Sequence, residues 1–362
     1  MKAAIISQGS TSSQWTAKAM SKYFDEVDEV SINRIEINLG GKDTEVLYEG
    51  KPLPDYDCIY AKGSFRYGPL SRALTAALCK KSYMPIKASA FTIGHDKLLT
   101  QLKLDQFKIA TPRTYLSASI EAGKKILEKI NYPIVMKFPD GTQGKGVMFA
   151  DSLSSASSFL DALTVLKQPF IIQEYVDTDG VDIRVIVVGD RCVASMKRKA
   201  VKGEKRSNIH AGGTGEPFVI DEKLRKISLA TAKALGAEIC AVDIMEGAKG
   251  YLVIEVNLSP GLQGITKVTK IDVADRIAQF LAAKTKALKE GSKEEDTKKI
   301  LEEVGIDKDG SFKEVITNLD FRGPRILLPA EVSRVMKLNE KDEVILKAER
   351  GRLEIRKMDI GE

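Results

Sequence analysis

The stretch IEVNLSPG, residues 254–261, places an acid and an amide two positions apart in an apolar run and then ends that run with Ser-Pro-Gly. With the residues before it, the run reads YLVIEVNL, whose β-branched and aliphatic residues predict a buried strand. Side chains at positions i and i+2 of a strand share a face, so Glu255 and Asn257 point the same way. A carboxylate and an amide are costly to bury alone, so this face needs a polar partner.

A third polar side chain is expected to lie beside these two. The preceding strand-like stretch AVDIME, residues 241–246, carries Asp243 between two apolar neighbours. Two adjacent strands would aim Asp243, Glu255 and Asn257 at one point. Three oxygen-bearing side chains with no His or Cys nearby suit Mg²⁺, which keeps water ligands and shares phosphate oxygens. The alternative that these residues leave open is a polar sheet edge with incidental acids.

A glycine-rich loop follows another predicted strand. The stretch KFPDGTQGKGV, residues 137–147, contains Gly141, Gly144 and Gly146. Backbone N–H groups of such a loop can wrap phosphates, although the spacing is neither the Walker pattern nor the dinucleotide fingerprint. Lys137, at the end of the strand, and Lys97, in GHDKLLTQ, are candidate phosphate contacts. An ordinary turn and solvated lysines are the alternatives.

Two more polar pairs repeat the i, i+2 pattern. Asp182 and Arg184 lie in the apolar stretch VDIRVIV, and Arg206 and Asn208 lie in EKRSNIH. Arginine grips phosphoryl and carboxylate oxygens with a fixed fork of donors. Nearby Arg198 and Lys199 add charge. Each pair alone could be an edge effect, but together with the glycine-rich loop they favour an anion site.

Composition limits the class of protein. The 362 residues are 43% hydrophobic and 29% charged with net charge +6, which predicts two to four folded units with solvated surfaces rather than a nucleic-acid footprint. No apolar run is long enough to span a membrane, and the first residues predict a strand rather than a signal peptide. The scattered cysteines predict core positions in a cytoplasmic protein; they are Cys58, Cys79, Cys192 and Cys240.

Strand-like pieces alternate with helical ones over the first 90 or so residues, which predicts a small doubly wound α/β unit. The pieces that favour strands there are KAAIIS, EVSINRIEI, TEVLYEG and CIYAKG. Helices are predicted over residues 221–236 and over VADRIAQFLAAKTKALKE, residues 273–290. Residues 289–318 are highly charged and poor in large apolar side chains, which indicates a linker with at most one helix.

In order, the stretches HDKLLTQ, PIVMKFPDGTQGKGV, IIQEYV, GVDIRVIVVGDRCVASMKRKAVKGEKRSNIHAGG, AVDIME and IEVNLSPGLQGI resemble the ATP-grasp fold, and within it the RimK-like amino-acid ligases. The resemblance implies an α/β and α+β architecture. Its segments would be an N-terminal α/β domain at 1–90, a central lobe at 91–170, a C-terminal lobe at 171–288 and a charged linker at 289–319. It also implies ATP held between the two lobes under a glycine-rich lid, with two Mg²⁺ ions for which Mn²⁺ can substitute.

The same resemblance implies a role for each candidate residue. The metal ligands would be Asp243, Glu255 and Asn257. The groups near the transferring phosphate or acyl phosphate would be Arg198, Arg206 and Asn208. The nucleotide would be held at the phosphates by Lys97, Lys137, Lys199 and the lid glycines, at the adenine by the backbone of Gln173, Glu174, Tyr175 and Val176, and at the ribose by Asp182.

Two features depart from the family pattern. RimK-like glutamate ligases usually carry an acid after SPGL, whereas this chain has Gln263, so the resemblance does not extend to glutamate as the added amino acid. The stretch YAKGSFRYG, residues 60–68, also differs from the usual text of the first domain. The identity of the acceptor therefore stays open.

The tail RILLPAEVSRVMKLNEKDEVILKAERGRLEIRK, within residues 320–358, resembles the AbrB-like swapped-hairpin domain. That family is usually dimeric and often binds DNA. The small charge excess of this tail favours a homo-oligomer or partner docking over DNA binding.

These patterns together predict an ATP-dependent carboxylate–amine ligase of the acid–amino-acid class. It would join an amino acid to a small-molecule, peptide or protein carboxylate through an acyl phosphate, without membrane contact. The alternative is a nucleotide-sensing regulator that binds DNA through its tail.

Overall fold

The structure is a computed structural model that describes residues 1–41, 44–117, 119–138, 146–165, 169–200, 214–248, 250–303, 320–322, 325–327, 339, 344–349 and 352–357. The chain divides into two compact units, residues 1–291 and 292–362, and each is described by itself.

The first unit begins with a parallel three-stranded sheet in the order β2-β1-β6. Its strands are β1 (Lys2–Ser7), β2 (Glu26–Ser31) and β6 (Cys58–Ala61). The helices that follow β1 and β6 are α1 (Thr11–Met20) and α2 (Gly68–Leu78). β6 is buried throughout and β1 nearly so, as expected for a parallel sheet that is covered on both faces. A parallel sheet whose strands alternate with helices along the chain, as the sequence predicts, is therefore present.

A small antiparallel sheet departs from the prediction. The stretch EVSINRIEI forms β2, a 3-10 turn at Ile32–Arg34 and then β3 (Ile35–Asn38), rather than one strand. β3 pairs with β4 (Glu45–Tyr48), which pairs with β5 (Lys51–Pro52). The break follows from the burial of Ile32 in the core, which turns the chain away from the first sheet.

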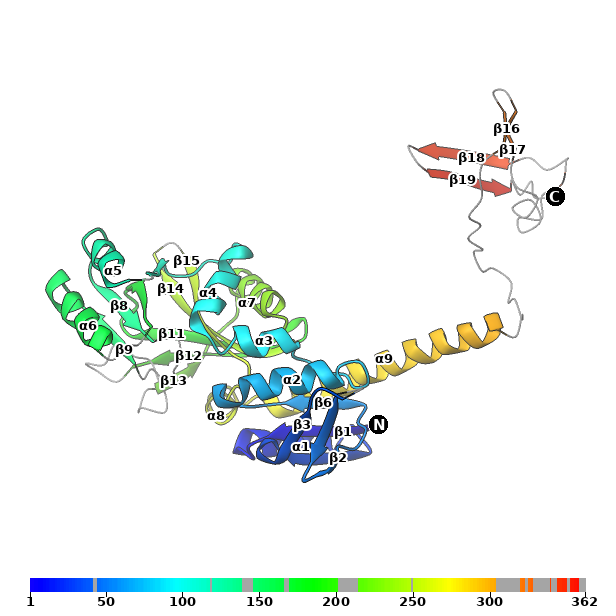
Figure 1. Cartoon of the computed structure of the whole chain (residues 1–362), viewed down its shortest axis with the longest axis horizontal. Helices are drawn as coiled ribbons and strands as arrows, with labels where there is room; N and C mark the ends of the chain where they lie inside the picture. The colour runs from blue at the N-terminus through cyan, green and yellow to red at the C-terminus, as the bar shows by residue number, and fades with distance from the viewer. Residues whose placement is uncertain are drawn as a thin grey trace. The chain divides into compact units, whose positions relative to one another are not determined.

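The central lobe has its own core. Its sheet has the order β7-β10-β8-β9, from β7 (Thr114–Tyr115), β8 (Ile134–Lys137), β9 (Val147–Ala150) and β10 (Ile171–Glu174). Helices α5 (Ile120–Leu127) and α6 (Leu153–Val165) lie side by side on this sheet (Figure 1). Leu127 and Leu160 of the helices and Ile134 of β8 are fully buried where the helices meet the sheet. Two helices, α3 (Ala88–Ile93) and α4 (Lys97–Gln106), lead into the lobe.

The C-terminal lobe is an antiparallel sheet in the order β13-β12-β11-β14-β15. Its strands are β11 (Val181–Val188), β12 (Arg191–Lys199), β13 (Thr214–Pro217), β14 (Ile239–Gly247) and β15 (Gly250–Asn257). Helix α7 (Glu222–Leu235) contacts β11, β12, β14 and β15. It begins at the N-cap Asp221 and ends at Gly236, whose φ of +74° is the left-handed conformation that glycine adopts at helix ends. The prediction of a helix over 221–236 is confirmed.

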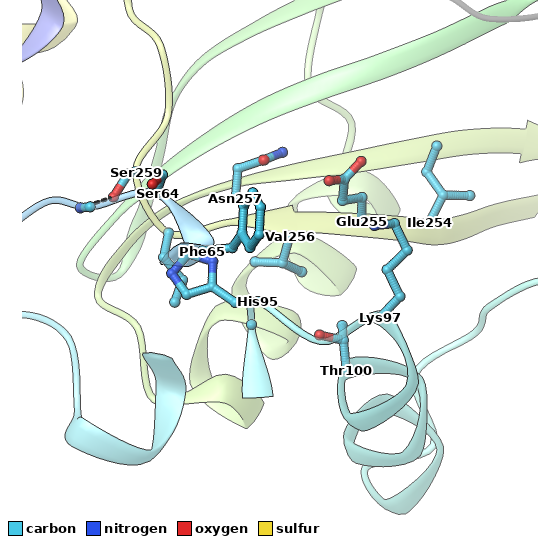
Figure 2. A pocket seen from close by; sticks show the side chains of 13 residues that line it. Ser64, Phe65, His95, Lys97, Thr100, Ile254, Glu255, Val256, Asn257 and Ser259 are labelled. Carbon is cyan, nitrogen blue, oxygen red and sulfur yellow. Dashed lines mark hydrogen bonds between the residues drawn. The ribbon is translucent and has the colours of Figure 1, made fainter. Parts of the chain in front are cut away.

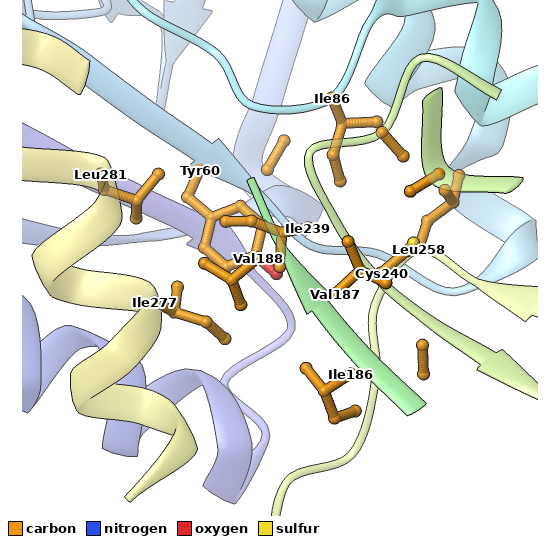
Figure 3. Packing of buried hydrophobic residues seen from close by; sticks show 14 of the residues in the cluster. Tyr60, Ile86, Ile186, Val187, Val188, Ile239, Cys240, Leu258, Ile277 and Leu281 are labelled. Atoms are coloured by element: carbon orange, nitrogen blue, oxygen red, sulfur yellow. The ribbon is translucent and has the colours of Figure 1, made fainter. Parts of the chain in front are cut away.

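One hydrophobic core joins the N-terminal sheet to the C-terminal lobe. Tyr60 of β6 packs with Val188 and Cys240 of the five-stranded sheet, and Ile277 and Leu281 of α9 (Val273–Glu303) close the same cluster (Figure 3). The loop after β15 and helix α8 (Gln263–Thr269) therefore lie on a rigid base, with Leu258 and Leu262 buried. This base fixes the end of β15, where the candidate site lies.

Helix α9 continues to Glu303, past the composition break at residue 289. The charged run is rich in Lys and Glu, which are good helix formers, so loss of apolar residues does not end the helix. In the second unit the described strands form two hairpins. One is β16 (Asp320–Arg322) with β17 (Arg325–Leu327), and the other is β18 (Val344–Glu349) with β19 (Arg352–Lys357).

The cysteines only partly match the expectation. All four are free thiols, and Cys58 and Cys240 are buried. Cys192 is half-buried, and Cys79 is exposed because it caps the C-terminus of α2, so those two are not core residues. Within the described part of the chain, no helix combines the length and the apolar character needed to cross a membrane.

Candidate active site

Three candidate metal ligands meet on adjacent strands, as the sequence predicts. In the β14–β15 ladder, Asp243 pairs with Glu255, and Ala241 pairs with Asn257. The register shifts by one residue at Ile254, a β-bulge that lets Glu255 share the face of Asp243 while Val253 stays fully buried. Without the bulge, simple alternation would place Val253 on the face of Glu255.

Asp243 is the centre of a buried ion network. Its two carboxylate oxygens accept hydrogen bonds from Arg184 Nε at 2.7 Å and Nη2 at 2.6 Å, and Oδ2 also lies 3.1 Å from Arg198 Nη2. Asn257 Nδ2 donates to the same Oδ2 at 3.3 Å. Burial would raise the pKa of Asp243, but the charges of the two arginines outweigh it and hold that pKa well below its ordinary value. Asp243 therefore stays ionised.

Glu255 has the opposite electrostatics. Burial raises the pKa of its carboxyl above the ordinary value, and the charge of Asp243 adds to this effect. The positive charges of Lys97, Arg184 and Lys137 oppose the rise only in part. The anionic form of Glu255 is thus held at a cost, which a cation bound between the two carboxylates would relieve.

Two lysines act on Glu255 from two directions. Lys97 is the first residue of α4, a helix capped by Asp96, whose side chain accepts from Leu99 N at 2.9 Å. Lys137 ends β8 in the central lobe, where burial lowers its pKa to about 8, with Glu255 raising it and Lys97 lowering it. The two amines and Glu255 therefore form one electrostatically coupled group.

Residues of the α3–α4 connection, of α4 and of β15 enclose a pocket at this point (Figure 2). Its volume is about 140 Å³, and its lining includes Glu255, Asn257, Lys97, His95 and Ser259. The β6–α2 loop, residues 63–65, forms another wall and is held by a hydrogen bond from Gly63 N to Ser259 Oγ at 3.0 Å. Figure 2 shows Lys97 reaching from α4 toward Glu255.

The donor set suits Mg²⁺. The described residues contain no group of three or more His, Cys, Asp and Glu side chains arranged as a complete metal cage. Of the predicted ligands, Glu255 and Asn257 line the pocket with a carboxylate and an amide, whereas both oxygens of Asp243 accept hydrogen bonds from arginine. Such a partial set fits a cation that completes its shell with water and phosphate oxygens. The oxygen donors of Glu255 and Asn257 in the pocket wall are the structural observation that fits such a cation.

The predicted adenine segment lies at the edge of the central lobe. Gln173 is buried on β10 and donates from Nε2 to Thr114 Oγ1 at 2.8 Å. Glu174 lies 3.4 Å from the hydroxyl of Tyr115. Tyr175 stacks edge-on against Phe149 with ring centroids 5.9 Å apart. Val176 follows directly, near Gly247 of β14.

The structure places Asp182 and Arg198 together as a buried ion pair. They face each other across β11 and β12, with Arg198 Nε donating to Asp182 Oδ1 at 2.6 Å. Arg198 thus bridges Asp182 to Asp243. Lys199 is exposed and lies on the opposite face of β12, so it does not join this network.

The lid is described only at its ends. Gly146 has a φ of +76°, and a Cβ there would lie 2.3 Å from Phe138 Cδ2, so only glycine fits. Gly141, Gly144, Arg206 and Asn208 lie outside the described residues.

Several residues in and around the site were not among the predicted ones. Arg184 was visible as the i+2 partner of Asp182, but its bond to Asp243 joins residues 59 positions apart. His95, Ser64 and Ser259 line the pocket but were not singled out from the sequence, although His95 lies in HDKLLTQ and Ser259 in IEVNLSPG. The only signal for His95 is its place two residues before Lys97.

Known proteins resemble this chain over most of its length. The protein family described as "RimK-like ATP-grasp domain" matches residues 94–281, which is more than half of the chain. A protein of Shewanella loihica named "Probable alpha-L-glutamate ligase" is 33% identical over 295 residues, which is 79% of this chain and 97% of that protein. The chain belongs to the RimK-like ATP-grasp family.

Other relatives of this RimK-like protein agree. A Vibrio cholerae protein with the same name is 32% identical over 286 residues, covering 78% of this chain and 95% of that protein. Among solved structures, a RimK domain ATP-grasp protein from Sphaerobacter thermophilus has a TM-score of 0.61 at 18% identity, covering 78% of this chain and 99% of that one. D-alanine–D-alanine ligase from Bacillus anthracis has a TM-score of 0.56 at 16% identity, covering 81% and 99%.

Family membership confirms the predicted ATP-grasp fold and the predicted class of activity, ATP-dependent carboxylate–amine ligation. These relatives do not support the alternative of a DNA-binding regulator. They are matched over nearly their whole length, and about a fifth of this RimK-like chain lies outside the match.

Proposed function

We propose that the chain joins an amino acid to a carboxylate acceptor through an acyl phosphate and releases ADP and phosphate, as an acid–amino-acid ligase. The convergence of Glu255, Asn257 and Lys97 on one pocket, with Asp243 beside them, supports this proposal. A site that neutralises phosphate charge next to a small cavity suits phosphoryl transfer to a bound carboxylate.

The reaction has two steps. An oxygen of the acceptor carboxylate attacks the γ-phosphorus of ATP, and the bond to the bridging oxygen breaks so that ADP leaves with its electron pair. The amine then attacks the acyl carbon, and phosphate leaves as the amide forms. Lys97 and Lys137 would hold the phosphates, while Arg198, Arg206 and Asn208 would face the transferring group. Asp182 and the 173–176 segment are proposed, from the sequence resemblance, to bind ribose and adenine.

Asp243, Glu255 and Asn257 would hold Mg²⁺. The bound ion would supply neutralisation of the charge that develops on the phosphate oxygens. A solved ATP-grasp ligase of similar fold, PsnB, is described in complex with Mg and ADP, and it has a TM-score of 0.60 at 18% identity. The hard oxygen donors of this chain fit the same ion.

The added amino acid depends on the start of α8. The named relatives are described as alpha-L-glutamate ligases, which makes glutamate one candidate. Gln263, which stands where such ligases usually carry an acid, accepts a hydrogen bond from Ser12 Oγ at 2.7 Å. Ser12 Oγ in turn accepts from Leu262 N at 2.8 Å. This neutral pair supports testing glutamine beside glutamate.

The acyl phosphate is tested by isotope transfer. Candidate carboxylates labelled with ¹⁸O are incubated with the full chain, ATP, Mg²⁺ and a mixture of amino acids. We expect one ¹⁸O atom to appear in the released phosphate by mass spectrometry, because the attacking oxygen stays with phosphorus. Hydroxylamine in place of the amino acids should trap a hydroxamate. Amide formation with unlabelled phosphate, or with AMP as product, would refute the mechanism.

The second unit is proposed to make the protein an oligomer. Its tail resembles the AbrB-like swapped hairpin, and the described hairpin β18–β19 exposes Leu346 and Leu353 at 61% and 56%. An isolated two-stranded hairpin is at best marginally stable, so a second copy of this chain is the proposed cover.

A further inference from the structure

The far end of the pocket has a different chemistry from the end that holds Glu255. In Figure 2, Glu255 and Lys97 lie toward one side, whereas His95, Phe65 and Ser64 lie toward the other. A volume of about 140 Å³ is well below the roughly 300–1,000 Å³ of pockets that bury drug-sized ligands, so the pocket suits a group of amino-acid size.

His95 is the polar group at this end that lacks a partner. Its Nε2 is buried and has no hydrogen-bond partner among the described residues. Phe91 packs against the ring at a centroid distance of 6.5 Å, and Cδ2 of His95 lies against the open face of Gly68. A buried ring nitrogen without a partner is costly in the free protein, and a ligand group that bonds to it removes that cost.

The end around His95 is also uncharged. Within the described lining, the charged side chains are Lys97 and Glu255, both on the other side. Burial lowers the pKa of His95, so the imidazole is neutral at physiological pH. A second carboxylate placed here would lack a cation, whereas an amide or hydroxyl could exchange hydrogen bonds with the ring.

We infer that His95 is a specificity-determining residue, and that the substrate portion in this pocket ends in an uncharged hydrogen-bonding group, such as a carboxamide, rather than in a second carboxylate. The inference rests on the proposed function, because it assumes that the reacting end of this substrate lies beside Glu255 and Lys97. In this inference the neutral imidazole of His95 selects the substrate by hydrogen bonding to the group at its far end.

Lys62 is the buried cation beside the wall segment 63–65, which the exposed Arg66 also flanks in the sequence. It precedes Gly63 but is not a lining residue, and its Nζ lies 5.7 Å from the centroid of the Tyr60 ring. Burial lowers the pKa of Lys62 to about 8. Its amine has no hydrogen-bond partner among the described residues, so it is the group that would receive a distal carboxylate if the inference were wrong.

The test measures binding of matched amide and acid probes. Isothermal titration of the full chain with Mg²⁺ and a non-hydrolysable ATP analogue compares L-glutamine with L-glutamate, and L-asparagine with L-aspartate. We expect one amide to bind at least about tenfold tighter than its acid. His95→Phe should reduce the preference below about threefold, and His95→Gln, which keeps a neutral hydrogen-bonding group, should retain it.

Two further measurements separate recognition from folding. The chain has two histidines, so the imidazole ¹⁵N signals of His95 are assigned from the His95→Gln variant, and the amide probe should shift them. The control is Thr75→Val, which removes another buried hydroxyl without a described partner, away from the pocket lining, and should leave the preference unchanged.

Three results would overturn the inference: an acid that binds as tightly as its amide, a preference that survives in His95→Phe, or no binding of either amide by the wild type. Loss of acid binding in Lys62→Met would then identify the cation that replaces His95. The ¹⁸O experiment does not depend on these outcomes. A failure of the amide preference would therefore not count against the proposed ligase mechanism.

Discussion

We expect the charge of Glu255 to lower the stability of the free protein and to support catalysis. Burial and the charge of Asp243 raise the pKa of its carboxyl, so its ionised form destabilises the fold without a bound cation. We expect Glu255→Gln to raise the free energy of unfolding by about 0.5–2 kcal/mol and to lower Mg²⁺-dependent turnover by at least about a hundredfold. Urea unfolding without ligands and a coupled ADP assay measure the two effects.

The size of this effect depends on pH. A carboxyl whose pKa is raised on folding penalises the native state above its folded pKa, and the penalty disappears as pH falls toward the unfolded value of 4.5. The advantage of Glu255→Gln should therefore be largest near neutral pH and shrink on acidification. Glu246→Gln, an exposed acid on the neighbouring strand, is the control and should change neither quantity. A destabilised Glu255→Gln would contradict the prediction.

If Lys137 binds the nucleotide as proposed, its lowered pKa predicts that binding weakens at alkaline pH. Burial lowers its pKa to about 8, with Lys97 adding to the fall and Glu255 opposing it. The charged form is complete below this value and is lost as pH rises through it, so kcat/KM for ATP should fall above about pH 8 by up to about tenfold per pH unit. Lys137→Arg keeps its charge to much higher pH and should flatten the profile. An equal fall in Lys137→Arg would assign the titration to another group.

Strand alternation locates only part of this site from the sequence. It places Glu255 and Asn257 on one face, and the structure agrees. It does not reveal the bulge at Ile254, because the bulge is set by which residues of two strands pair. The bond between Arg184 and Asp243 has the same origin, since it depends on the register between β11 and β14. His95 lies in the quoted stretch HDKLLTQ, but the sequence does not show that its Nε2 lacks a partner among the described residues.

At the scale of elements, we expect the position of hairpin β8–β9 to depend on Gly146, which directly precedes β9. Gly146 has positive φ and its hydrogen atoms face Phe138, which would lie 2.3 Å from a Cβ. We expect Gly146→Ala to displace Phe138, and with it the neighbouring Lys137, so that KM for ATP rises. The strained backbone alone should cost about 1–3 kcal/mol of stability.

Substitution of a second glycine with a similar φ distinguishes the effect of the clash with Phe138 from the effect of backbone strain. Gly50 has a φ of +74°, close to the +76° of Gly146, but no atom lies within 4 Å of its Cβ position. Gly50→Ala should lose stability without a change in KM for ATP. In a double-mutant cycle, Phe138→Ala should recover part of the loss caused by Gly146→Ala. Identical effects of the two alanine substitutions would show that contact with Phe138 is unimportant.

Elements with strong local signals were predictable, and those set by distant contacts were not. Helix α7 has a capping Asp221 and a terminal Gly236, and its prediction is confirmed. The stretch EVSINRIEI is split because Ile32 enters the core, which no local pattern indicates. The end of α9 at Glu303 was hidden by a composition that suits both a helix and a solvated linker.

At the scale of the whole molecule, the ligase core and the second unit are separate compact bodies. The match to the Shewanella relative covers 97% of that protein but only 79% of this chain. About a fifth of this chain therefore has no counterpart in that relative. The core should therefore fold and turn over ATP alone. The second unit must then contribute something other than the fold of the ligase.

The hairpin β18–β19 is amphipathic, which indicates what that contribution is. In its ladder, Leu346 pairs with Ile355 and Ala348 pairs with Leu353, so these apolar side chains share one face. The other face carries charged residues, including Lys347 and its partner Glu354. A hairpin with one apolar face is stable only when that face is covered, and self-association is the simplest cover.

We therefore expect the full chain to be a dimer or larger by light scattering, and a chain ending at Gly291 to be smaller by more than the mass removed. The shorter chain should keep Mg²⁺-dependent turnover within about twofold, because the site lies wholly in the first unit. Leu346→Lys combined with Leu353→Lys places two like charges on the apolar face and should dissociate the full chain without loss of turnover. Lys347→Leu, on the charged face, is the control and should leave the mass unchanged. A full-length monomer would exclude the role in assembly, and an inactive, unfolded core would make the second unit part of the ligase fold.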